Sequence, residues 1–104
     1  MSRKAALLGI VAAFVAGAAT ADPGSLGAPL CGVLKGVGPR TRGLEPEAAR
    51  AQLVRALVAA FDNDAARLKE VHAHIDEATL KACAKDREVV LVNTKAKSLA
   101  EAIE

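Results

Sequence analysis

The two cysteines of this chain, Cys31 and Cys83, constrain its fold more than any other feature of the sequence. A hydrophobic leader precedes them, and exported chains reach compartments in which paired thiols oxidise. A disulfide between them would close a loop of about 50 residues and stabilise the fold by about 4 kcal/mol on the chain-entropy model. The alternative is two free thiols, of which one could act as a nucleophile. An even count of two behind an export signal favours the disulfide.

The leader has the three parts of a secretory signal peptide. Arg3 and Lys4 form a basic start, residues 5–19 carry no charged side chain, and Ala19-Thr20-Ala21 places small residues at the −3 and −1 positions of a cleavage site. A retained membrane anchor is the alternative, but the apolar run is shorter than the roughly 20 residues of a spanning helix. We therefore expect a Sec-type signal peptide over residues 1–21, cleaved after Ala21, and a periplasmic or secreted mature form without a membrane span.

Cleavage would change the charge of the protein. The full chain has 14 basic and 12 acidic residues and a formal charge of +2 at pH 7. Loss of Arg3 and Lys4 makes the two counts equal, so the mature chain is neutral. A neutral surface with one remaining aromatic residue, Phe61, offers nucleic acid neither electrostatic attraction nor stacking platforms. The sequence therefore predicts no nucleic-acid partner and leaves a protein partner as the expectation.

The mature chain divides into an arm and one domain. Residues 22–28 contain Pro23, Gly24 and Gly27, which predicts a flexible arm. Residues 29–104 form a single helical domain, and a domain of about 80 residues with an alanine-rich interior is marginal without a covalent staple. The expected fold is all-α, a small disulfide-stapled bundle of four to five short helices.

Apolar residues recur at helical spacing through this domain. The first stripe lies between Pro29 and Gly38, the second begins at the helix-starting Pro46, and the third follows the turn-forming sequence Asp62-Asn63-Asp64. The stripes are Leu30, Val33, Leu34 and Val37; Leu53, Val54, Leu57, Val58 and Phe61; and Leu68, Val71 and Ile75. Gly32 and Gly36 share a face of the first helix, where a neighbouring helix could approach closely.

Two later regions leave alternatives. Asp76 either caps a third segment bearing Thr79, Leu80 and Cys83, or lies within a longer second helix. Residues 89–92 have strand propensity, but Val89, Val92, Ala96, Leu99 and Ile103 step by three and four, which favours a helix. Ser98-Leu99-Ala100-Glu101 fits a capping box, at which a helix can restart.

The sequence offers little catalytic or metal-binding chemistry. His72 and His74 are two residues apart and point to opposite sides of a helix, so they cannot share a metal ion. The sequence Asp62-Asn63-Asp64 lacks the glycine and the distal glutamate of a calcium loop. Ser25 and Ser98, the serines outside the leader, lack a strand-turn-helix context. We therefore expect a non-enzymatic protein with no cofactor, no metal and no catalytic residue.

The sequence around the second cysteine resembles the small periplasmic acid-stress chaperones of the HdeA/HdeB type. Ala82-Cys83-Ala84-Lys85-Asp86 is similar to the Ala-Cys-x-x-Asp setting of that family, and Lys95 and Lys97 follow in the next predicted helix. An export signal, an all-helical chain of this size and one disulfide complete the likeness. The chain departs from the family after the first cysteine, where Gly32-Val33-Leu34 replaces an acidic and an aromatic residue.

This resemblance implies an acid-triggered mechanism. Around pH 2 the carboxylates are protonated and the mature chain carries about +14 charges, so self-repulsion would loosen the fold. The apolar surface around Leu57, Phe61 and Leu68 would then open and bind unfolded clients. The competing class is a constitutively folded helical interaction module, an inhibitor or assembly subunit that docks on one envelope partner. The sequence leaves a homodimer open in either case.

Overall fold

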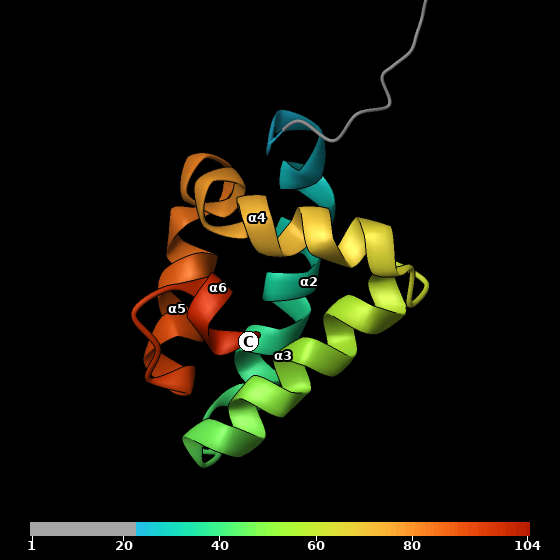
Figure 1. Ribbon diagram of the computed structural model, residues 1–104. Helices are drawn as coiled ribbons and strands as arrows, with labels where there is room; N and C mark the ends of the chain where they lie inside the picture. The colour runs from blue at the N-terminus through green and yellow to red at the C-terminus, as the bar shows by residue number, and fades with distance from the viewer. Residues whose placement is uncertain (1–22) are drawn as a thin grey trace, which may run out of the picture.

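The computed structural model describes residues 23–104, which form five helices and, within this range, no strand. The helices are α2 (Pro23–Thr41), α3 (Pro46–Ala60), α4 (Ala65–Ala82), α5 (Ala84–Thr94) and α6 (Leu99–Ala102) (Figure 1). The all-α bundle that the sequence predicted is therefore confirmed. The expected signal peptide, residues 1–21, lies outside the described residues.

Helix α2 begins earlier than the sequence predicted. It starts at Pro23 rather than Pro29, so residues 23–28 are helical and the expected flexible arm is wrong over this range. Proline suits the first turn of a helix, and Pro23 fills that position as well as Pro29 would. Leu26 lies one turn before Leu30 and is buried, so it extends the apolar stripe of the helix. This added burial explains why the helix continues through Pro29.

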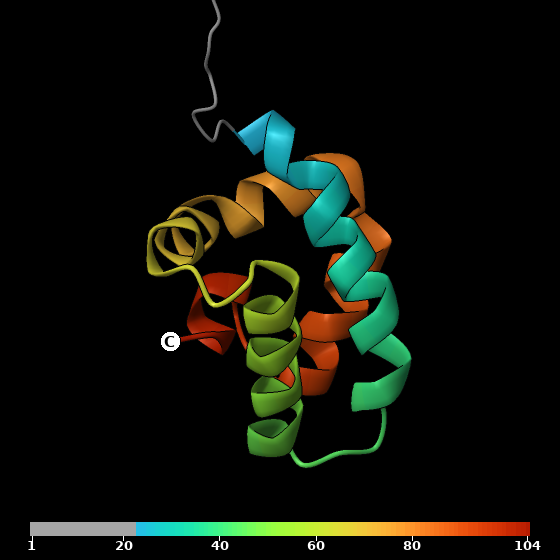
Figure 2. The same ribbon diagram turned by 90° about the vertical axis from the view of Figure 1, so that its right-hand side faces the viewer.

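Helices α2 and α3 run antiparallel and are joined by a short loop (Figure 2). Gly43 in this loop has a φ of 80°, a left-handed conformation that glycine adopts without steric cost. Pro46 occupies the first turn of α3, as predicted, and Glu47 follows it there. The side chains of Leu53, Leu57 and Phe61 on α3 face the interior and are buried.

Helix α4 crosses α2 and packs against it (Figure 1). The predicted turn at Asp62-Asn63-Asp64 separates it from α3, and Asp62 and Asn63 both have a positive φ. The Asp64 side chain accepts hydrogen bonds from the backbone amides of Ala66 and Arg67, which caps the start of α4. Asp76 begins no third segment, since α4 continues without interruption to Ala82.

Helix α5 confirms the helical interpretation of residues 89–92 and corrects the face that is buried. Val90 and Thr94 are buried, whereas Val89 and Val92 of the predicted stripe are exposed. The helix ends at Thr94, where Arg50 of α3 donates hydrogen bonds to the carbonyl oxygens of Thr94 and Lys95. The predicted stripe therefore does not belong to one helix. Val89 and Val92 lie in α5, whereas Leu99 lies in α6.

Residues 98–104 follow as a short segment that includes α6. Ser98 caps α6 by accepting a hydrogen bond from the Glu101 amide, as the capping box predicted. The Glu101 carboxylate accepts from the amide of Lys97 instead of Ser98, one residue earlier than in the standard motif. Helix α6 contacts α4 and α5 and covers one side of the core.

The core lies where all five helices meet. Its members are thirteen buried apolar side chains, with Phe61 the largest: Leu26, Leu30, Leu34, Val37, Leu53, Leu57, Phe61, Val71, Ile75, Ala78, Val90, Leu99 and Ala102. Three buried threonines, Thr41, Thr79 and Thr94, each donate a hydroxyl hydrogen bond to a carbonyl of their own helix. These polar side chains are therefore satisfied in the interior.

Candidate functional site

Cys31 and Cys83 form the predicted disulfide, with their Cα atoms 5.9 Å apart. Cys31 lies in the middle of α2 and Cys83 lies at the break between α4 and α5. The bond therefore joins α2 directly to the point at which the chain changes direction. Because both sulfurs are in the disulfide, neither thiolate is available as a nucleophile in this oxidised form.

The residues predicted to bind partners lie inside the folded protein or at the edge of its core. Leu57 is 2% exposed and Phe61 1% exposed, while Leu68 is half-buried and packs against the core. The guanidinium of Arg67 covers the ring of Phe61, with its carbon 5.1 Å from the ring centroid. The folded state therefore presents little of this set to a partner.

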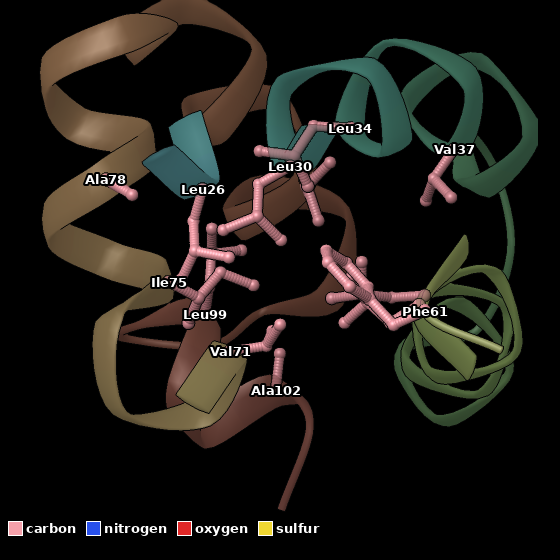
Figure 3. Close-up of a cluster of buried hydrophobic side chains, with 13 residues drawn as sticks. Leu26, Leu30, Leu34, Val37, Phe61, Val71, Ile75, Ala78, Leu99 and Ala102 are labelled. Carbon is pink, nitrogen blue, oxygen red and sulfur yellow. The ribbon is translucent and has the colours of Figure 1, made fainter. Parts of the chain in front are cut away.

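A groove between α3 and α4 runs beside these residues. This α3–α4 groove has an open cleft of about 160 Å³ lined by Val54, Leu57, Val58, Leu68, Val71, His72 and Ile103. Six of these side chains belong to α3 and α4, and Ile103 belongs to the 98–104 segment. Figure 3 shows Leu99 beside Ile75 and Ala102 beside Val71, so the segment follows α4 in the reverse direction toward the groove.

One carboxylate holds this segment on the bundle. Asp76 on α4 accepts hydrogen bonds from the backbone amides of Leu99 (2.8 Å) and Ala100 (3.0 Å), the first two residues of α6. The same carboxylate pairs with Nη2 of Arg87 on α5 at 2.9 Å. Asp76 therefore bridges three helices. It satisfies two amides that α6 itself cannot pair.

The electrostatic environment favours the charged form of Asp76. Partial burial acts to raise the pKa of its carboxyl group. The two amide hydrogen bonds and Arg87 outweigh that effect and hold the pKa below its usual 3.8. A carboxylate with a lowered pKa stabilises the fold at pH values above 3.8, and this contribution is lost as the pH falls below that value.

A second hollow lies between α2 and α5, and we call it the α2–α5 groove. Its larger part is an open hollow of about 460 Å³ that includes Val89, Val92, Arg42 and Lys85. A smaller part shares Arg42 and Val89 and reaches Leu34 on α2. Val92 is 62% exposed, the largest exposed fraction among the bulky apolar side chains described. This is the most accessible apolar surface on α5.

The histidines and other metal-ligating residues form no centre. His74 is half-buried, His72 is exposed, and the residues that the structure describes contain no group of three side chains able to hold a metal ion. Asp76, the residue four positions after His72, is engaged by Arg87 and by α6. Within residues 23–104, no helix combines the length and hydropathy of a membrane-crossing segment.

Comparison with family models, with curated proteins and with solved structures finds no match for this chain.

Asp76, Arg87 and Ile103 are site residues whose roles the sequence did not indicate. Asp76 could have been recognised from its place in the sequence, because it follows Ile75 and precedes Thr79 by three residues, and both of these are buried. That placement puts an acidic group at the border of the core. Its partners on α6 lie 23 and 24 residues further along the chain, and no local pattern connects them.

Proposed function

We propose that this protein is a small exported chaperone that binds unfolded proteins at acid pH and remains closed at neutral pH. The apolar residues Leu57, Phe61 and Leu68 are its binding surface once the helices separate. Two observations support this function: the resemblance of the sequence around Cys83 to the acid-stress chaperones, and the contacts of Asp76 in the structure. The proposed function needs no catalytic step and no cofactor. It places the protein in an oxidising envelope compartment, in which its disulfide is stable.

The observation that supports this function best is the bridge made by Asp76. This carboxylate joins α4 to α5 and α6. It lies beside the buried core residues Ile75 and Leu99. Protonation would remove the partner of the Arg87 cation and weaken two amide hydrogen bonds at once. Acid would therefore act directly on the contacts that keep the apolar surface closed.

The charges around the bridge point in the same direction. Arg87 faces Asp76 from α5, the amides of Leu99 and Ala100 face it from α6, and His72 lies at the α3–α4 groove on its own helix. Glu101, the acidic residue of α6, accepts a hydrogen bond from the Lys97 amide. At pH 2 the general positive charge of the chain adds repulsion between the helices. The disulfide meanwhile keeps α2 attached to the junction of α4 and α5.

An aggregation assay tests this function. The purified, oxidised protein is mixed at equimolar ratio with an acid-unfolded client, and light scattering is followed at pH 7 and at pH 2 to 3. We expect little protection at pH 7 and clear suppression of scattering at pH 2 to 3. Asp76→Asn should move the onset of protection toward neutral pH, whereas Glu77→Gln on the adjacent exposed position should not. Absence of protection by the wild-type protein at acid pH would refute the chaperone function.

The alternative function is a constitutively folded interaction module. The exposed Val89 and Val92 in the α2–α5 groove favour it, because this surface is open without any change of fold. Such a module should show circular dichroism that hardly changes down to pH 3, and it should retain one specific partner in a pull-down. An acid titration followed by circular dichroism and analytical ultracentrifugation separates the two functions. The ultracentrifugation also shows whether the protein is a homodimer.

A further inference from the structure

We propose that the α3–α4 groove is the client-binding site and that the 98–104 segment occupies it as an internal pseudo-ligand. The clients would be short helical segments with bulky apolar side chains at positions i and i+4. This inference rests on the proposed function and specifies its substrate. It follows from what the folded chain already places on the surface formed by α3 and α4.

The chemistry of the occupant is visible in the segment itself. Leu99, Ala102 and Ile103 lie at i, i+3 and i+4, so they form one apolar face of a single helical turn. Leu99 is fully buried and Ala102 nearly so, while Ile103 packs against the edge of the core. Ser98 and Glu101 keep the backbone amides on the other side satisfied. An unfolded chain contains many short stretches of this composition.

The groove has room beyond its present occupant. The open cleft of about 160 Å³ adjoins Ile103 and continues between Val58 and Leu68. A client with a longer side chain than isoleucine at this position could fill that space and bury more apolar area. The segment therefore fills only part of the groove, which favours its replacement by a better fitting client.

The attachment of the segment is suited to release. It follows Cys83 in the sequence, so it lies outside the loop that the disulfide closes and can move without straining that bond. Its polar contacts with the rest of the bundle include the two amide hydrogen bonds to Asp76, which acid weakens. Arg87 on α5 pairs with Asp76 at this attachment, and His72 on α4 lines the groove. Glu101 on the segment itself accepts a hydrogen bond from the Lys97 amide. Release would expose Val71 and Leu57 while α2, α4 and α5 remain connected.

The test uses a synthetic peptide of residues 97–104 and the methyl NMR spectrum of the protein at pH 7. The protein lacking residues 98–104 should show peptide-dependent shifts in the methyl groups of Leu57, Leu68 and Val71, and none in those of Val92 on α5. The full-length protein should show none of these shifts, because its own segment occupies the groove. A peptide carrying Leu99→Ser and Ile103→Ser should bind neither protein.

A second variant covers the case in which the shortened protein does not fold. Full-length Ile103→Ser keeps Leu99 and the amide contacts to Asp76 but vacates the part of the groove that Ile103 lines. The Ile103 side chain of the peptide should enter there and shift the methyl groups of Leu57 and Leu68. Equal peptide shifts in wild-type and variant proteins, or no shifts in any folded variant, would overturn the pseudo-ligand. Peptide binding without protection of clients at pH 2 to 3 would instead overturn the chaperone function and leave the groove assignment standing.

Discussion

Arg87 on α5 is 17% exposed, and its guanidinium donates to Asp76 on α4 at 2.9 Å. Its Nε atom is buried and has no hydrogen-bond partner within the described part of the chain. Asp76 is also the sole anion that forms a salt bridge with Arg87 among residues 23–104. Neutralisation of Asp76 therefore leaves a largely buried cation uncompensated, which destabilises the packing of α4 against α5.

Asp76→Asn should lower the free energy of unfolding at pH 7 by about 1–3 kcal/mol, because Arg87 and two amides lose a charged acceptor. The lowered pKa of Asp76 means that its contribution is present above pH 3.8 and lost below it. The difference between the wild-type protein and the variant should therefore shrink as the pH falls from 7 to 2. Urea unfolding at several pH values measures it.

Glu77→Gln is the matched control for this experiment. Glu77 is the next residue on α4, and its ion pair is a surface contact with Lys81 at 3.9 Å. Surface pairs of this kind contribute little to stability, so we expect a change below about 0.5 kcal/mol at every pH. A variant of Asp76 that behaves like this control would show that the bridge has no role in acid sensitivity.

Reduction of the Cys31–Cys83 disulfide should destabilise the protein by about 4 kcal/mol. The bond restrains a loop with a sequence separation of 52 residues, and a small domain has only about 5–15 kcal/mol of net stability. Urea unfolding of the oxidised protein and of the Cys31→Ala, Cys83→Ala double variant should show a large fall in midpoint. Equal midpoints would mean that the helices pack well enough without the covalent connection.

The helices, the disulfide and the turns were largely predictable from the sequence, because local signals determine them. Pro46 has no amide proton to satisfy at the start of α3, and the Asp62-Asn63-Asp64 turn and the Ser98 cap satisfy backbone groups within a few residues. The start of α2 was predicted too late, because Pro23 and Pro29 are equally good first-turn residues and only tertiary burial of Leu26 decides between them.

The candidate site was less predictable, because its parts come from distant positions. Periodicity indicates a helix but not which face its neighbours cover, so Val89 and Val92 were assigned to an apolar stripe although Val90 is the buried residue of α5. The amides that Asp76 binds belong to a segment more than twenty positions later. Such contacts depend on how the helices pack.

Val90→Ser should destabilise the protein by about 2–4 kcal/mol, since it removes a fully buried apolar side chain and leaves a cavity with a hydroxyl in it. Val92→Ser, two positions along α5, should change stability by less than about 0.5 kcal/mol, because Val92 is exposed. Thermal unfolding of the two variants measures the contrast. Similar losses for both would contradict the orientation of α5. Loss of a specific partner on Val92→Ser alone would favour the interaction module.

Gly32→Ala should stabilise the protein by about 0.5–1 kcal/mol, because alanine has the higher helix propensity and a Cβ atom at this exposed position meets nothing within 4 Å. The sequence suggested that a neighbouring helix could approach at Gly32 and Gly36, but the close contact on α2 is at Gly27. A Cβ atom there would lie 3.3 Å from Cβ of Ala82.

Gly27→Ala should therefore give a smaller gain than Gly32→Ala, or a loss, because α2 and α4 would have to separate slightly. Thermal unfolding of both variants, with sedimentation to record the oligomeric state, compares the two positions. If Gly32→Ala instead destabilised the protein or dissociated a dimer, a second copy would cover this face of α2 in solution. The dimer contact would then lie on α2, and the proposed client groove lies between α3 and α4.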